Sequence, residues 1–212
     1  MAMDYKERID LELERVRSGL TLPSVDSLPD LQKASVVSNY GAAIEPNFVQ
    51  WMYDTYLSVE SYRAKKVLDE NLHTEIADDH RRMLRNFVRD CGVDTHLVLS
   101  LQDVSVPVLK MWALFVVGSG LSNLSVITAL ENASLTFIPY LAEIGEKLGC
   151  KDFTYTNVHG AADIGHATSL RDGLVEELKF VGSQRDDYAL PEVIASFGVT
   201  TSFLNSILIP KP

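Results

Sequence analysis

Hydrophobic residues recur at helical spacing along almost the whole chain, with turn-forming residues between the periodic segments. The segment 30–58 contains Pro46, which suits the first turn of a second helical piece, so it is predicted as two pieces, 30–44 and 46–58. Residues 95–101 have a weak strand pattern and are interpreted as a loop. The predicted helices cover residues 4–19, 30–58, 60–90, 107–118, 121–148, 153–181 and 188–206.

This pattern predicts an all-α protein built as a single-domain seven-helix bundle over residues 1–212. The chain contains no internal repeat and no convincing linker. Its length suits one domain and is ample for a buried core. A kink or break is expected at Pro139, inside the helix predicted over 121–148.

The composition argues against several classes of partner. The net charge of −10 disfavours a nucleic-acid-binding surface and an anionic membrane. The longest apolar run, 111–117, is too short to span a bilayer, so no membrane partner is expected. Cys91 and Cys150 match no metal-binding spacing and are interpreted as free thiols. The charged first segment lacks the apolar stretch of a signal peptide. Together with the free thiols, this predicts a cytoplasmic protein.

The most informative motif is His159-x-x-x-Asp163-x-x-His166. In a helix these offsets place all three side chains on one stripe. Small and apolar residues separate them, which indicates a helix that packs closely against its neighbours. Two imidazoles and a carboxylate on a buried stripe suit a transition metal better than a hydrophobic core.

Three other predicted helices offer comparable side chains toward the same interior. Glu45, His80 and Glu131 each lie on or beside the apolar stripe of a separate helix. Together with the motif they supply three carboxylates and three imidazoles, which is a normal ligand shell for a dinuclear iron or manganese site in a helical bundle. The alternative is a buried polar network without a metal.

These residues give the chain a resemblance to the haem-oxygenase-like di-metal oxidases and oxygenases, over residues 35–175. Beyond the late motif, that family has a helix of the type NLxxE…HxxL, matched here by Asn71-Leu72-His73-Thr74-Glu75 and by His80 with Met83 in place of Leu. It also has a central-helix Glu followed by small residues, matched at Glu131, and an earlier Glu, matched at Glu45.

The resemblance implies a haem-oxygenase-like fold and a non-haem di-iron enzyme that uses O2 as co-substrate. The implied cofactors are two Fe(II) ions, with manganese as the alternative metal, and an external electron donor. Relatives carry out N-oxygenation, desaturation, oxidative C–C cleavage or nitrile formation, many of them in specialised-metabolite biosynthesis. The expected substrate is a small molecule, an amino acid or a close derivative, and the expected assembly is a monomer or a homodimer. The candidate pocket residues, which face inward one turn from the predicted ligands, are Tyr40, Phe48, Met52, Met83, Phe87, Phe137 and Tyr155.

One position departs from the family pattern. In several relatives the Glu of NLxxE is a further ligand, separated from the His by more residues. Here Glu75 is five positions before His80, which on a continuous helix places it about 140° away from the His80 stripe. Either a kink brings Glu75 in, or the protein lacks this ligand, or His73 or Glu70 takes its place.

Two other functions remain open from the sequence. The first is a metal-free enzyme on the same fold, either a thiaminase-like hydrolase with a Cys nucleophile or a cofactorless oxidase. Cys91 and Cys150 fall at predicted helix ends without acid partners on a shared stripe, which counts against the hydrolase. The second is a non-catalytic helical binding protein, which would not need Glu131 and His159 on apolar stripes.

Overall fold

The computed structural model describes residues 4–93, 98–183 and 188–209, apart from the side chains of 98–103 and 161–163. Every regular element in these ranges is helical, as predicted. The described ranges contain nine α-helices and a short 3₁₀ turn at Val25–Ser27. The helices are α1 (Tyr5–Ser18), α2 (Asp30–Ile44), α3 (Phe48–Ser58), α4 (Tyr62–Ala77), α5 (His80–Asp90), α6 (Val98–Val117), α7 (Gly120–Leu148), α8 (Thr154–Gly182) and α9 (Ala189–Leu208).

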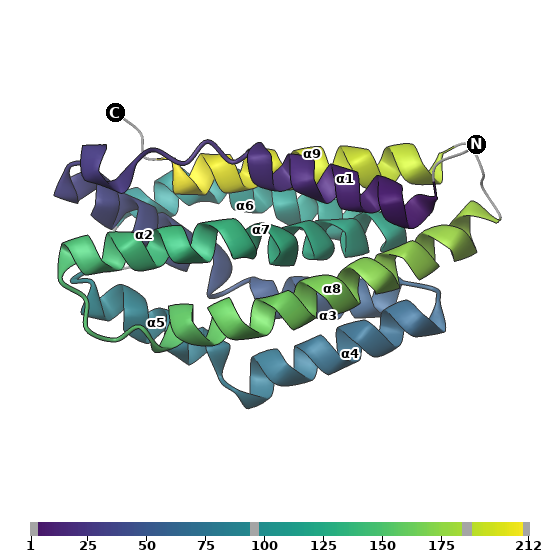
Figure 1. Cartoon of the computed structure of the whole chain (residues 1–212), viewed down its shortest axis with the longest axis horizontal. Helices are drawn as coiled ribbons and strands as arrows, with labels where there is room; N and C mark the ends of the chain where they lie inside the picture. Colours follow the sequence, from purple (N-terminus) through teal and green to yellow (C-terminus); the bar gives the residue numbers. More distant parts are fainter. Residues whose placement is uncertain (1–3, 94–97, 184–187, 210–212) are drawn as a thin grey trace.

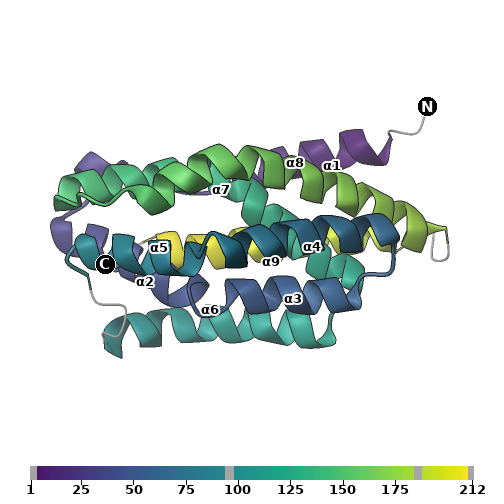
Figure 2. The ribbon, with the colours of Figure 1, turned by 90° about the horizontal axis from the view of Figure 1, so that it is seen from below.

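Most helices run roughly along the long axis of an elongated bundle (Figure 1). Helix α7 passes through its middle and contacts α1, α2, α3, α6, α8 and α9. Its most extensive partner is α8, and the two lie side by side in both views (Figures 1 and 2). Helices α4 and α5 follow one another along one side and both contact α8.

Helix α7 is the structural centre because it is buried on nearly all sides. Buried positions occur in every turn from Leu121 to Gly145, as expected for a helix surrounded by others. Among the described residues, it is also the one helix long and apolar enough to cross a membrane by length and composition. In the structure, 83% of the most apolar part of α7 is buried against the rest of the chain.

The predicted helix 60–90 is in fact two helices. Helix α4 ends at Ala77 and α5 begins at His80, and the chain turns visibly between them (Figure 1). Asp79 takes the left-handed conformation, with φ 54° and ψ 45°, and it is the one non-glycine residue with positive φ in the described ranges. This conformation costs a non-glycine residue about 1–2 kcal/mol, although Asp tolerates it better than most. Because of this break, the side chains of α5 face different directions from those that a continuous helix would give them.

Two further expectations about helix ends were wrong. Helix α6 begins at Val98 and contains Pro107, rather than beginning there. Residues 98–101 are therefore helical and not a loop, while 95–97 lie outside the described residues. Pro139 lies within α7 without ending it. In both helices tertiary packing outweighs the single backbone hydrogen bond that a proline removes.

A buried carboxylate joins α4 to α8. Glu177 of α8 is fully buried, and its two oxygens accept hydrogen bonds from the backbone N–H groups of Glu60, at 2.8 Å, and Ser61, at 2.7 Å. Ser61 in turn caps α4 by accepting a bond from the Ala64 N–H. The N–H groups of Ser61 and Ala64 are among the donors at the start of a helix that have no partner within the helix. The contact thus sets where α4 begins relative to α8.

We expect Glu177→Ala to lower the free energy of unfolding by about 2–4 kcal/mol, because it leaves two buried N–H groups without their acceptor. The matched control is Glu176→Ala, which removes an exposed carboxylate paired with Lys179 and should change stability by less than about 1 kcal/mol. Chemical denaturation followed by circular dichroism measures both. Equal effects of the two substitutions would contradict the anchoring role of Glu177.

Candidate metal centre

Five side chains of types that can bind a metal meet inside the bundle, and they come from four helices. Glu75 comes from α4, His80 from α5, Glu131 from α7, and His159 and His166 from α8. All are buried except His166, which is half-buried. Helix α4 turns a stripe of buried residues inward, and Glu75 lies at the end of this stripe. The bundle thus brings two carboxylates and three imidazoles together away from solvent.

The five side chains form two groups of three donors. One group is Glu75, His80 and His159, and the other is Glu75, Glu131 and His166. Within each group the donor atoms lie within 4.8 Å of one another. Atoms that bind one ion at roughly 2.0–2.2 Å are at most about 4 Å apart, so each group needs only a small contraction to hold an ion. Glu75 belongs to both groups, and its carboxylate has two oxygens, one for each group.

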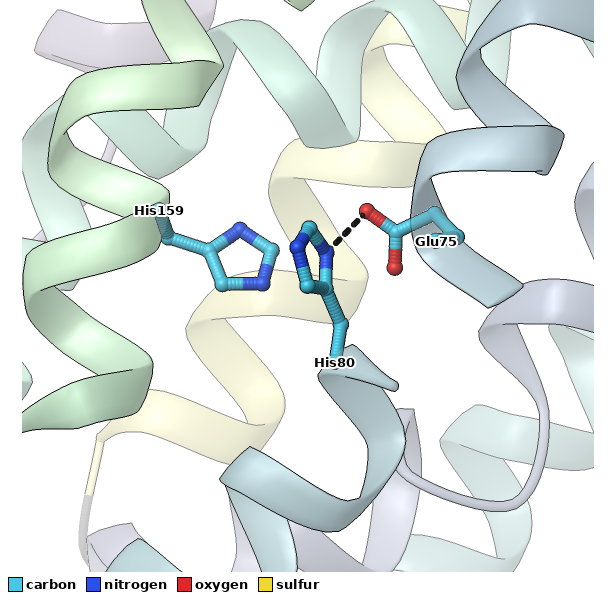
Figure 3. Close-up of side chains that lie close together, drawn as sticks. All are labelled: Glu75, His80 and His159. Carbon is cyan, nitrogen blue, oxygen red and sulfur yellow. Dashed lines mark hydrogen bonds and ion pairs between the residues drawn. The ribbon is translucent and has the colours of Figure 1, made fainter. Parts of the chain in front are cut away.

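The first group is shown in Figure 3, where three side chains from three helices point toward one another. Nδ1 of His80 lies 2.7 Å from Oε1 of Glu75. The rings of His80 and His159 are 4.5 Å apart between centroids. This contact with Glu75 orients the imidazole of His80 within the group.

Aromatic side chains also pack against His159 and its neighbours. The Tyr155 ring lies 4.4 Å from the His159 ring between centroids. The hydroxyl of Tyr155 is 2.7 Å from that of Tyr40 on α2, and Tyr40 packs against Phe137 of α7. Packing on several sides restricts the imidazole to few rotamers, as a preorganised ligand requires.

The donor set fits iron. Imidazole nitrogen and carboxylate oxygen are the ligands of non-haem iron and manganese sites in helical bundles. Burial adds to the argument, because two buried carboxylates near one another repel and lose solvation unless protons or cations offset their charge. One dication in each three-donor group would supply that charge, with Glu75 between the two.

The structure brings together four of the six predicted ligands, His80, Glu131, His159 and His166. The fifth, Asp163, lies on α8 between the two histidines, but its side chain lies outside the described residues.

The sixth predicted ligand, Glu45, belongs to neither of the two groups that the described residues form. It follows α2, and its Oε1 accepts hydrogen bonds from Nε of Arg81 at 2.8 Å and Nη2 of Arg85 at 2.6 Å. Burial raises the pKa of Glu45, but the hydrogen bonds from Arg85 and Arg81 outweigh this and leave it below its usual value. The two guanidinium groups hold the carboxylate where its charge is compensated without a metal.

At the position that the sequence left open, the structure places Glu75, rather than His73 or Glu70, beside the other candidate ligands. The helix break at Asp79 removes the angle that a continuous helix would put between Glu75 and His80. His73 and Glu70 are both exposed on the outer face of α4, and Glu70 pairs with Lys66. The adjacent pair Asp78-Asp79, which favours turns and tolerates a left-handed backbone, is the sequence signal for this break.

A cavity reaches the centre and is lined by Glu75, His80, Glu131 and His159 on one side. Most of its remaining wall is apolar or aromatic, including the sequence-predicted pocket residues Tyr40, Phe48, Phe137 and Tyr155. The other three pocket candidates, Met52, Met83 and Phe87, do not line it; Met52 and Phe87 are buried in the core. Arg81 also lines the cavity, but the sequence did not predict it as a pocket residue, because no feature distinguishes it from the neighbouring arginines.

The family of iron-containing redox enzymes has a model that matches residues 41–190 of this chain. No curated protein matches the chain. Among solved structures, the crystal structure of a TenA homologue from Pseudomonas syringae pv. tomato strain DC3000 is similar, with a TM-score of 0.58 and 13% identity. The match covers 95% of this chain and 91% of that chain.

The structural match establishes the fold alone, and it confirms the haem-oxygenase-like architecture implied by the sequence motifs. The family match includes all five side chains of the centre. Since it spans well over half of the sequence, the chain belongs to the family of iron-containing redox enzymes.

Proposed function

We propose that the protein is an O2-activating non-haem di-iron oxidase or oxygenase that acts on a small substrate. The observation that carries this proposal is the pair of three-donor groups that share Glu75. Two such groups suit two iron ions, with manganese as the alternative metal, and a shared carboxylate suits a bridge between them. Membership in a family of iron-containing redox enzymes supports the same reading.

The residues of the chain would hold the metals, position the substrate and exclude water. Glu75, His80 and His159 would bind one iron, and Glu75, Glu131 and His166 the other, leaving coordination positions for external ligands. Bound iron supplies reaction with O2 and the electrons for it. The apolar cavity wall would place the substrate beside the centre and keep the site dry, which limits side reactions.

The tyrosine pair next to the centre has a positioning role in this proposal. Tyr155 packs on His159, and its hydroxyl is bonded to Tyr40. Both tyrosines line the cavity. The Tyr155 ring would keep His159 directed at the first iron position, and the two hydroxyl groups would offer the cavity a fixed polar point.

The second candidate function is metal-free chemistry, such as that of a thiaminase-like hydrolase, and the TenA homologue with its similar fold keeps it in view. A Cys nucleophile needs a lowered pKa. Burial instead raises the pKa of Cys91 and of Cys150. Cys150 also lies 3.2 Å from a carboxylate oxygen of Asp90, which disfavours a thiolate. The thiol chemistry therefore favours the di-iron proposal.

The substrate class, partners and location belong to the proposal as well. The apolar walls and the nearby carboxylates and imidazoles suit the chemistry of a small amino acid or derivative, for which the cavity of about 50 Å³ would have to widen. An external donor would return the iron to the ferrous state. We propose a cytoplasmic protein that acts in specialised-metabolite biosynthesis without nucleic-acid or membrane partners, as a monomer or homodimer.

Glu75→Gln should reduce iron binding at both positions, because it removes negative charge from the ligand that the two groups share. We expect less than one iron per chain and affinity weakened by about 10–100-fold or more. Glu70→Gln is the matched control, since Glu70 lies on the same helix and is exposed. Anaerobic Fe(II) titration with metal analysis measures both variants. Wild-type iron content in Glu75→Gln would contradict a bridging role.

The direct test of function combines iron loading with O2. Protein loaded anaerobically with Fe(II) should react with O2 in stopped flow and give a transient visible absorption change, and an amino-acid substrate should alter its rate of formation or decay. Glu131→Leu, which removes a donor and keeps an apolar volume at that position, should be folded and lack the transient. No iron uptake and no transient in the wild-type protein would favour the metal-free alternative.

A further inference from the structure

The cavity has a second charged region, at its entrance rather than at the metal centre. Arg81 lines the cavity with its side chain 52% exposed, whereas the Glu45 side chain beside it is 17% exposed. Arg85, one helical turn further along α5, reaches the same Glu45 oxygen. Each of these bonds uses one of the five N–H donors of a guanidinium group.

This cluster, Glu45, Arg81 and Arg85, has more positive than negative charge. Two guanidinium groups face one carboxylate, in a chain whose net charge is −10. Arg81 also lies in the first turn of α5, where the helix dipole disfavours a cation. Helix stability therefore does not explain an arginine at this place, whereas recognition of an anion does.

The rest of the cavity indicates what kind of anion would fit. Arg81 directly follows His80, so the entrance arginine and the metal centre are neighbours along the chain. Apolar side chains cover much of the wall, among them Ile44, Phe48, Leu130, Phe137 and Ile138. A ligand with a carboxylate and a small apolar body matches the chemistry of these walls, with the carboxylate at the arginine. The free space of about 50 Å³ must widen by side-chain movement to admit the apolar body.

We infer that Arg81, together with Arg85, binds the carboxylate of a small apolar acid or amino acid, and that Glu45 occupies this subsite until the ligand displaces it. Half-exposed ion pairs contribute little, so a ligand carboxylate that makes two parallel bonds to a guanidinium can replace Glu45. The inference deepens the proposed function by naming the substrate group that is recognised, but binding at this subsite requires no iron.

The test measures binding to the full-length chain after removal of metal by a chelator, so that no carboxylate can bind iron instead. The probes are 3-phenylpropionate and its uncharged counterpart 3-phenylpropionamide, titrated by ligand-observed NMR. We expect the carboxylate to bind more tightly than the amide. Arg81→Gln should weaken carboxylate binding by about tenfold and leave amide binding unchanged.

Two further variants make the test specific. Arg82→Gln is the matched control, because Arg82 is the next residue and pairs with Asp79, and its carboxylate affinity should stay within about twofold of wild type. Glu45→Gln removes the internal competitor and should strengthen carboxylate binding by about two- to fivefold. A gain in affinity cannot result from misfolding.

Equal binding of the acid and the amide, or no carboxylate binding at millimolar concentration, would overturn the inference. Unchanged affinity in Arg81→Gln, or weaker binding in Glu45→Gln, would overturn it as well. Iron content is measured on separate samples of the same proteins. If iron loading fails but the probes bind as predicted, the di-iron proposal is rejected and the subsite is retained. If iron loads as predicted but the probe results fail, the subsite is rejected and the di-iron proposal is retained.

Discussion

The contact between Glu75 and His80 depends on a break in the helix that carries them. On a continuous helix, residues five positions apart face directions about 140° apart, and these two side chains could not meet. The left-handed backbone of Asp79 ends α4 and starts α5 in a new phase, which places His80 Nδ1 2.7 Å from Glu75. That backbone conformation costs a non-glycine residue about 1–2 kcal/mol. Strain concentrated beside a functional site is a common observation in enzymes.

The rest of the bundle keeps this local geometry in place. Helix α7 supplies Glu131 from the centre of the core, and α8 supplies both His159 and His166. The buried carboxylate of Glu177 connects α8 to the start of α4. A group of buried acids and imidazoles gains its stability from precise mutual placement, because any unpaired member would retain its full desolvation cost. In the proposed function, the same rigidity would let the centre bind metal without large rearrangement.

Much of this arrangement could be predicted from the sequence, because helical periodicity is a strong local signal. The all-α class followed from it, and the spacing of His159 and His166 placed both on one face of α8. Three-dimensional consequences of short local features were harder to predict. The Asp78-Asp79 break was hidden inside a segment with continuous helical periodicity, so the role of Glu75 stayed open. The direction of Glu45 depended on Arg81 and Arg85, which are 36 and 40 positions away in sequence, and no periodic pattern reports such a pairing.

The most direct test of the account is the crystal structure of the protein soaked anaerobically with Fe(II), with anomalous diffraction collected at the iron edge. We predict two iron peaks, one near His80 and His159 and the other near Glu131 and His166. Each iron should lie within roughly 2.0–2.3 Å of an oxygen of Glu75. A single peak, or two irons with Glu75 bound to neither, would contradict the shared-carboxylate centre on which the account rests.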